Sequence, residues 1–272
     1  THSASSAASD VYKRQTAFIT GGASGIGLGI AKAFLNSGAN VAIGDINKEQ
    51  LSIAEKELKT ISGNVISLTI DTTDLSTLES ASKTISDSFG NLHYLCNNAG
   101  IPGGAKILET PEERWRLVHE VNFMGPLNGI NLFLPQMLEH GESSHIVNTS
   151  SFSGIHGHGN QSAYGSSKFA LVGMSEFLRN DLKDSNVSVS VLCPHVVDTP
   201  IIGGLKKRVS ENVLKMIKDM EVSPITVGEQ VLNAIRTKEF YIFCDGVHTR
   251  QMLEARCESL LEAMDRQFPR RD

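Results

Sequence analysis

Tyr164 and Lys168 stand four residues apart in a stretch with a helical pattern, so both side chains are expected on one helix face. The ordinary tyrosine pKa of about 10 is too high for proton exchange near neutrality, and a neighbouring ammonium group lowers it by stabilising the phenolate. Ser151, at the end of an expected strand, offers a hydroxyl nearby. Alone, Tyr-x-x-x-Lys is a common surface pair; beside a nucleotide site it indicates acid–base chemistry.

A glycine-rich turn, Thr20-Gly-Gly-Ala-Ser-Gly-Ile-Gly27, follows the first expected strand and opens a helix. Glycines at such a turn let backbone N–H groups approach a pyrophosphate at the positive end of the helix. Asp45 ends the second expected strand, where a carboxylate can accept both hydroxyls of an adenosine ribose. Two plainer interpretations remain open, a glycine turn without a ligand and an aspartate that caps the next helix.

These motifs together resemble those of the short-chain dehydrogenase/reductase family. The matching segments, in the family's order and over nearly all of the chain after Thr16, are Gly21-xxx-Gly25-x-Gly27, Asn97-Asn-Ala-Gly100, Ser151 and Tyr164-Gly-Ser-Ser-Lys168. The resemblance implies an NAD(P)-dependent oxidoreductase that interconverts a secondary alcohol and a ketone. It implies that Tyr164 donates a proton to the carbonyl oxygen, Ser151 hydrogen-bonds that oxygen and Lys168 also holds the nicotinamide ribose. Asn122 would anchor a water relay behind Lys168.

Further cofactor contacts are implied by the same resemblance. Asp71 and Thr72 would hold the adenine edge, and Thr199 would contact the nicotinamide carboxamide. The complete set of cofactor-binding residues expected is Gly21, Ser24, Gly25, Ile26, Gly27, Asp45, Asp71, Thr72, Asn98, Ala99, Gly100, Tyr164, Lys168, Pro194, Val197 and Thr199.

The chain departs from the family after Pro194, where the family usually has glycine and this sequence has His195. That side chain could narrow the nicotinamide pocket or contact the substrate. His156 and His158 add a His-x-His motif, which can coordinate zinc or iron. A metal is nevertheless not expected, because such a site needs further ligands and hydride transfer needs none. A flexible stretch beside the substrate pocket or a plain surface position suits these two histidines better.

The elements that must position these residues alternate between short β-rich runs and amphipathic helical stretches, which is typical of an α/β fold. We predict a single doubly wound, Rossmann-type domain with a seven-stranded parallel sheet. The expected strands are 16–20, 40–44, 65–70, 94–97, 145–149, 187–193 and 241–244. The expected helices start near Gly25, Asn47, Asp74, Pro111, Ser162 and Thr226, the last with a capping box, Thr226-Val-Gly-Glu229.

The domain is expected to occupy residues 16–272, and residues 1–15 are interpreted as a non-native or disordered tail. Residues 203–222 are polar and follow the sixth strand, so they are expected to form a substrate lid over the carboxyl edge of the sheet. Residues 248–268 are expected to form a terminal helix with an apolar stripe. The stripe consists of Leu253, Leu260, Leu261 and Met264.

Composition narrows the possible partners of this 272-residue chain. It has 25 lysines and arginines against 30 aspartates and glutamates, and the net charge of -5 offers no basic surface for nucleic acid or an anionic membrane. Four scattered cysteines without paired spacing favour a reducing, cytoplasmic location. The helices around Leu127–Met137 and Phe169–Phe177 carry more apolar residues than one sheet face requires, which predicts a homodimer or homotetramer.

NAD is the expected cofactor. An NADP-dependent carbonyl reductase is the first alternative, and both Asp45 and the neutral Ser24 disfavour it, since relatives that use NADP often carry a basic residue there. A dinucleotide-binding regulatory protein without turnover is the second; it would not need a poised proton donor. The sequence indicates only a medium-sized, partly apolar alcohol or ketone as substrate.

Overall fold

A seven-stranded parallel sheet forms the centre of the protein in a computed structural model that describes residues 12–206 and 209–269. The strand order is β3-β2-β1-β4-β5-β6-β7. Strands β1 to β3 are therefore added toward one edge of the sheet and β4 to β7 toward the other, as in a doubly wound fold. The strands are β1 (Thr16–Thr20), β2 (Asn40–Asp45), β3 (Val65–Thr69), β4 (Tyr94–Asn97), β5 (Ser144–Thr149), β6 (Val187–Cys193) and β7 (Tyr241–Phe243). The predicted fold class is confirmed.

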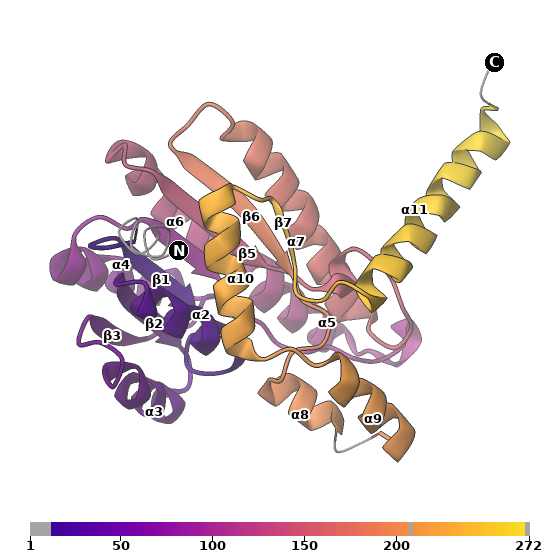
Figure 1. The fold of residues 1–272 in the computed structure, drawn as a ribbon, viewed down its shortest axis with the longest axis horizontal. Coiled ribbons are helices and arrows are strands. Elements are labelled where there is room, and N and C mark those ends of the chain that lie inside the picture. Colours follow the sequence, from indigo (N-terminus) through magenta and orange to yellow (C-terminus); the bar gives the residue numbers. More distant parts are fainter. Residues whose placement is uncertain (1–11, 207–208, 270–272) are drawn as a thin grey trace, which may run out of the picture.

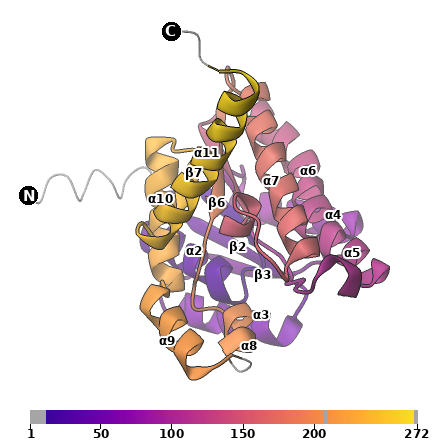
Figure 2. The ribbon, with the colours of Figure 1, turned by 90° about the vertical axis from the view of Figure 1, so that its right-hand side faces the viewer.

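Helices cover both faces of the sheet, as Figures 1 and 2 show. One face carries α2, α3 and α10, and the other carries α4, α6 and α7, with α5 beside α7. The helices are α2 (Gly25–Asn36), α3 (Lys48–Lys59), α4 (Leu75–Phe89), α5 (Glu112–His119), α6 (Gly125–Glu139), α7 (Ser162–Asp181), α8 (Pro200–Lys206), α9 (Glu211–Met220), α10 (Pro224–Thr237) and α11 (His248–Gln267).

The central strands are buried on both faces, which explains why their sequences are continuous apolar runs rather than alternating ones. Every residue of β1 is buried. Ala17 and Ile19 belong to the core under α2, α3 and α10, whereas Phe18 faces the core under α4 and α6. Phe18 packs against Phe133 of α6 with ring centroids 5.3 Å apart. The two cores fix the sheet rigidly, and loops at its carboxyl edge are left to form a site.

Two glycines allow α2 and α10 to pack closely. A Cβ atom on Gly29 would lie 2.0 Å from the carbonyl oxygen of Pro224, and one on Gly228 would lie 2.3 Å from that of Gly29. The helix α10 begins at Pro224, with Ser223 as its cap, because the Ser223 hydroxyl accepts a hydrogen bond from the Thr226 amide at 3.2 Å. The capping box predicted at Thr226 is therefore wrong by one turn.

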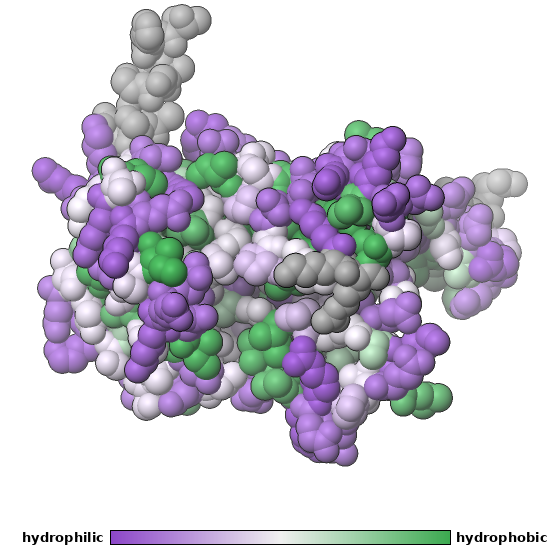
Figure 3. Space-filling view, turned by 90° about the horizontal axis from the view of Figure 1, so that it is seen from below, coloured by the Kyte–Doolittle hydropathy of each residue, from purple (hydrophilic) through white to green (hydrophobic). Residues whose placement is uncertain are grey.

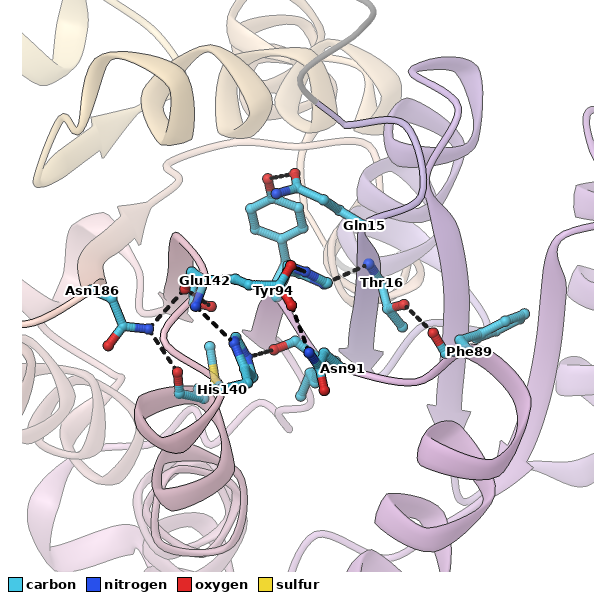
Figure 4. A network of polar contacts seen from close by, with 12 residues as sticks. Gln15, Thr16, Phe89, Asn91, Tyr94, His140, Glu142 and Asn186 are labelled. Carbon is cyan, nitrogen blue, oxygen red and sulfur yellow. Dashed lines mark hydrogen bonds and ion pairs between the residues drawn. The ribbon is translucent and has the colours of Figure 1, made fainter.

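A polar network at the opposite, amino-terminal end of the strands ties β1, β4 and the start of β5 together (Figure 4). His93 accepts a hydrogen bond from the Thr16 amide through Nδ1 at 3.1 Å, and its Nε2 lies 3.0 Å from Glu142. Asn91 donates to the same carboxylate at 2.6 Å. Hydrogen bonds from His93 and Asn91 hold the pKa of Glu142 below its ordinary value. This network holds the sheet at the edge away from the glycine turn.

Two residues of the expected tail, Tyr12 and Gln15, pack onto the domain, whereas Lys13 and Arg14 between them are exposed. Tyr12 is 4% exposed, its ring lies 6.0 Å from that of Phe34, and its hydroxyl donates to the Leu232 carbonyl at 2.7 Å. Gln15 contacts the Tyr94 hydroxyl, and its carbonyl accepts from the Asn40 amide at 2.9 Å. An aromatic ring at position 12 reaches core surface between α2 and α10, so the packed domain starts before residue 16. Residues 1–11 lie outside the described residues.

Helices α8 and α9 fill most of the expected lid, between two extended segments joined by a β-bridge between Val197 and Val222. The Asp198 amide donates to the Val222 carbonyl at 3.0 Å, which joins the two ends of this segment. The expected terminal helix is present as α11, but it projects from the body (Figure 1). Three residues of its apolar stripe, Leu260, Leu261 and Met264, are exposed rather than packed.

Replacing Gly29 by alanine is expected to lower the free energy of unfolding by about 2 kcal/mol or more, because the new methyl group forces α2 and α10 apart. Gly173→Ala in α7 is the matched control: apart from the backbone of its own helix, no described heavy atom lies within 4 Å of the place that its methyl group would take, and helix propensity predicts a gain of about 1 kcal/mol. Urea denaturation measures both. Equal effects of the two substitutions would contradict the close packing.

Candidate active site

A cleft of about 320 Å³ opens at the carboxyl ends of β1, β4, β5 and β6, next to the lid. On the face that carries α8 and α9, the space-filling view shows apolar and polar side chains intermixed around a recess (Figure 3). The cleft is lined by Gly21, Ser24, Gly25, Ile26, Asp45, Asn98, Ala99, Gly100, Thr149, Ser150, Ser151, Tyr164, Lys168, Pro194, His195, Val197, Thr199, Pro200, Ile201 and Ile202. Parallel strands end at the same edge, so residues distant in sequence meet here.

The glycine turn is built for close approach of a ligand to backbone. Gly21 and Gly25 have φ angles of 64° and 51°, in the left-handed region that favours glycine. A Cβ on Gly27 would lie 2.2 Å from the Gly21 carbonyl oxygen, so Gly27 is needed under the turn rather than at the cleft surface. The Ser24 side chain makes no capping hydrogen bond to α2, which leaves helix N–H groups free for an anion.

Asp45 turns its carboxylate toward this glycine turn. Its Oδ2 accepts a hydrogen bond from the Ala23 amide at 3.4 Å, and its Oδ1 accepts from the Asn47 amide at 3.0 Å. The cap of α3 is Asn47, whose side chain accepts from the Gln50 amide at 3.0 Å. The alternative interpretation of Asp45 as the helix cap is therefore wrong, and its carboxylate lines the cleft.

The ends of β1 and β4 are tied to each other by side chains. The Thr20 hydroxyl accepts hydrogen bonds from the Asn98 and Ala99 amides, each at 3.0 Å. In return, Asn98 Nδ2 donates to the carbonyls of Thr20 and Gly21 at 3.1 and 3.3 Å. Asn98 and Ala99 thus lie directly beside the glycine turn, and both line the cleft with Gly100.

Tyr164 and Lys168 lie on one face of α7 and line the cleft together with Ser151. The Lys168 ammonium donates to the Thr149 carbonyl at 2.8 Å and lies 5.7 Å from the centre of the Tyr164 ring. Ser151 accepts a hydrogen bond from the Ser153 amide at 3.1 Å and donates to the Pro194 carbonyl at 3.5 Å. The structure brings all three predicted side chains into one cleft.

Burial governs the titration of this group of residues. It lowers the pKa of Lys168 to about 8 and raises the pKa of Tyr164, an effect that a hydrogen bond with Ser151 partly opposes. We expected the Lys168 ammonium to lower the tyrosine pKa. That expectation is wrong for this structure, because the phenol and the ammonium are both removed from water and desolvation disfavours the charged form of each.

Asn122 lies behind Lys168 in a π-helical turn, Glu120–Met124, between α5 and α6. It is completely buried; its Oδ1 accepts from the Ile101 amide at 2.8 Å, and its Nδ2 donates to the Ile101 carbonyl at 3.0 Å. A Cβ on Gly100 would lie 3.2 Å from Asn122 Oδ1 and 3.4 Å from Lys168 Nζ. Asn122 is thus next to the lysine without lining the cleft itself.

Two predicted cofactor residues, Asp71 and Thr72, are not among those that line the cleft. The Asp71 carboxylate accepts from the Thr73 amide at 2.9 Å and from the Thr73 hydroxyl at 2.7 Å. Thr72 is buried under α6, where its carbonyl accepts from Asn128 at 3.0 Å. Neither side chain is presented to the cleft in this structure.

His156 and His158 do not line the cleft either; His156 stacks on Phe152 at 5.9 Å, and His158 lies 3.5 Å from the Ser153 hydroxyl. In the described part of the chain, no group of three or more His, Cys, Asp or Glu side chains is placed to hold a metal ion.

Sequence reasoning did not assign a role to five cleft residues, Thr149, Ser150, Pro200, Ile201 and Ile202. The first two end β5, whose carboxyl end had to lie at the site in a parallel sheet, so topology could have found them. The other three start α8, whose position depends on the fold of the lid and leaves no motif in the sequence.

Residues 15–210 match the family model for short chain dehydrogenases. The chain belongs to the short-chain dehydrogenase family. Its similarity to 1-deoxy-11-beta-hydroxypentalenate dehydrogenase of Streptomyces exfoliatus is 36% identity over 234 residues, covering 85% of this chain and 83% of that protein. This short-chain dehydrogenase is accordingly an oxidoreductase with a dinucleotide-binding fold.

Two solved structures of other family members show the same fold with different cofactors. A short-chain dehydrogenase/reductase from Burkholderia phymatum in complex with NAD has a TM-score of 0.83 at 27% identity and covers 96% of this chain and 98% of its own. An actinorhodin polyketide ketoreductase with NADPH has a TM-score of 0.80 at 28% identity over 84% of this chain and 95% of its own. Among the described residues of this short-chain dehydrogenase, no helix has the length and apolar character needed to cross a membrane.

The depressed pKa of Lys168 makes a prediction about stability. Below pH 8 the folded protein carries a buried charge on Lys168. Between pH 8 and 10.5 this lysine binds a proton in the unfolded chain but not in the folded protein, so the free energy of unfolding rises with pH. Relative to Lys168→Met, the wild type is expected to gain roughly 2 to 3 kcal/mol between pH 7 and 10. Denaturation of the cofactor-free proteins measures this gain; parallel pH profiles would contradict the buried charge.

Proposed function

We propose that this short-chain dehydrogenase transfers hydride between NAD(H) and a secondary alcohol or ketone through Tyr164, Lys168, Ser151 and Asn122. The observation that carries the proposal is the meeting of Tyr164, Ser151 and Lys168 in one cleft with the glycine turn. A similarity to a hydroxypentalenate dehydrogenase supports a hydroxyl-bearing substrate. Ile201, Ile202 and Val197 give the cleft an apolar wall, which suits a medium-sized, partly apolar molecule.

The residues present fit a nicotinamide dinucleotide. The left-handed Gly21 and Gly25 and the uncapped start of α2 suit a pyrophosphate, and the Asp45 carboxylate suits a ribose diol. Bound NAD supplies the hydride acceptor for alcohol oxidation. The same resemblance assigns Thr199, with Val197 beside it, to the nicotinamide end and Pro194 to the cofactor site, and all three line the cleft.

In the direction of ketone reduction, Tyr164 donates its phenolic proton to the carbonyl oxygen while Ser151 holds that oxygen by a hydrogen bond. The raised pKa keeps the phenol protonated before the reaction, as a proton donor requires. Lys168 stabilises the phenolate that is left, and Asn122, next to Lys168 and bonded to Ile101, holds the lysine's surroundings in place. Alcohol oxidation follows the same steps in reverse.

Tyr164→Phe is expected to retain the fold and NAD binding but lose about 10²- to 10⁴-fold in kcat, since it removes the proton and keeps the ring. Tyr241→Phe is the matched control, because Tyr241 contacts Glu176 away from the cleft. Steady-state kinetics on a panel of cyclic, terpenoid, steroid-like and polyol alcohols, with calorimetry for NAD, measures both. Retained activity in Tyr164→Phe excludes the acid–base role; a wild type that binds NAD and oxidises no alcohol favours the regulatory-protein alternative.

We propose NAD rather than NADP as the physiological cofactor because of Asp45. A carboxylate about 4 Å from a 2′-phosphate repels each unit of charge by about 4 kcal/mol at an effective dielectric constant near 20. If salt and rearrangement remove half of that, about 2 kcal/mol remains, which is roughly a thirtyfold preference. The alternative, an NADP-dependent carbonyl reductase, has the similarity to an NADPH-bound ketoreductase in its favour.

Asp45→Ser is expected to raise kcat/KM with NADP and lower it with NAD, because the phosphate loses its repulsion while the ribose loses its acceptor. Asp71→Ser is the matched control, since the Asp71 carboxylate bonds Thr73 away from the cleft. It should leave the ratio of the two cofactors unchanged. Equal kcat/KM values for both cofactors in the wild type would show that Asp45 does not select NAD.

We further propose that the protein is a homodimer or homotetramer. On α7, the Phe177 side chain is 74% exposed, and on α6 Leu138 is 38% exposed, so both helices present apolar surface to solvent. Leu138 was not among the residues behind this expectation. Four that were, Ile130, Phe133 and Met137 of α6 and Val172 of α7, are buried in the protein's own core and do not support it. Four free cysteines, three of them buried, support the proposed cytoplasmic location.

A further inference from the structure

His195 lines the cleft at the place where the family usually has glycine, and specific contacts hold the residues around it. Its neighbour Pro194 accepts hydrogen bonds from the Ser151 hydroxyl at 3.5 Å and from the Phe152 amide at 2.8 Å. The Phe152 ring lies 5.4 Å from the imidazole. His195 is therefore held next to the serine proposed to bind the reacting oxygen.

The buried edge of His195 faces an acidic residue. Nδ1 is buried, makes no hydrogen bond within the described residues, and lies 3.7 Å from Oδ2 of Asp245. Asp245 is itself fixed at the start of α11, where it accepts from the Thr249 amide at 3.2 Å and the Thr249 hydroxyl at 2.6 Å. The two side chains are only 24% and 15% exposed. A carboxylate at this edge favours the tautomer with the proton on Nδ1.

We infer that His195, oriented by Asp245, determines substrate specificity by accepting, through Nε2, a hydrogen bond from a second hydroxyl group close to the reacting carbon. With Nδ1 facing Asp245, Nε2 is the nitrogen left for the cleft, and in the neutral ring it is an acceptor. The preferred substrate class is then a vicinal hydroxy alcohol rather than a simple alcohol. This inference rests on the proposed function and refines its substrate.

The charge state of His195 is set by groups on several elements. Burial lowers its pKa, Asp245 opposes this, and His158, His248 and His156 lower it further. The ring is therefore neutral at pH 7, and its acceptor is present. Protonation at lower pH turns Nε2 into a donor, so the preference for a hydroxyl partner is expected to fall as the pH falls through the pKa of His195.

Kinetics with cyclohexane-1,2-diol and cyclohexanol, each with NAD, test the inference. The wild type is expected to favour the diol at least tenfold in kcat/KM, mostly through KM. His195→Phe should reduce this ratio to about one, and His195→Gln, which keeps an acceptor, should restore part of it. His156→Gln is the matched histidine control and should keep the wild-type ratio. A ratio unchanged in His195→Phe overturns the inference.

Asp245→Asn tests whether the orientation of the His195 ring, rather than its size, gives the preference for the diol. The asparagine oxygen can still accept from the Thr249 amide, but its amide group donates to Nδ1, which moves the ring proton to Nε2 and should remove the preference for the diol. Nitrogen-15 spectra of labelled histidines read the tautomer directly: Nδ1–H is expected in the wild type and Nε2–H in Asp245→Asn. Nε2–H in the wild type at pH 7 overturns the inference.

The same spectra distinguish failure of this inference from failure of the proposed function. If the wild type oxidises neither alcohol, the proposed function fails for these substrates, and binding then decides the role of His195. In the complex with NADH, the diol is expected to shift the Nε2 resonance of His195 while cyclohexanol leaves it in place. No shift with the diol overturns the inference regardless of turnover.

Discussion

Burial of the Lys168 ammonium against the carboxyl end of β5 is the interaction on which the site depends. Its hydrogen bond to the Thr149 carbonyl joins α7 to the sheet, and the Ser150 hydroxyl adds a second link by donating to the Lys168 carbonyl at 2.9 Å. Gly154 permits this approach, since a Cβ there would lie 2.6 Å from that carbonyl oxygen. With the helix fixed in this way, Tyr164, one turn earlier, has to face Ser151.

The free-energy cost of burying the Lys168 ammonium bears on two features beside it, its hydrogen bond to Thr149 and the π-helical turn that contains Asn122. Removing an ammonium group from water is unfavourable unless its donors are satisfied, and one donor is satisfied by Thr149. Asn122 occupies the other side, in a π-helical turn that bonds both backbone groups of Ile101. A π turn inside a long helix costs free energy, and such turns are frequent at functional sites. Hydrogen bonds thus hold Lys168 and Asn122 in place beside the cleft.

Local sequence signals predicted much of this arrangement, because glycine turns, strand ends and helical spacing are read within a few residues. Gly21, Gly25, Asp45, Ser151 and Tyr164 all line the cleft as expected. Properties that depend on burial in the tertiary structure could not be predicted from local sequence. The predicted direction of the Tyr164 pKa shift was wrong because desolvation depends on the packing of α7, which no sequence motif reports. The packing of Tyr12 was missed for the same reason.

The pairing of His195 with Asp245 belongs to this second kind, since the two residues are separated by the whole lid and α10. It also connects two parts of the molecule, the cleft at the sheet edge and the segment at the start of α11. The sheet edge and α7 carry the residues proposed for proton transfer, and Asp245 bonds Thr249 at the start of α11 while facing the His195 ring. Helix α11 projects from the body and contributes little to the core, and its Arg256 lies 5.3 Å from the centre of the Phe169 ring of α7. Under the proposed function, a change at Asp245 would alter which alcohol is recognised while leaving the hydrogen bond between Lys168 and the Thr149 carbonyl in place.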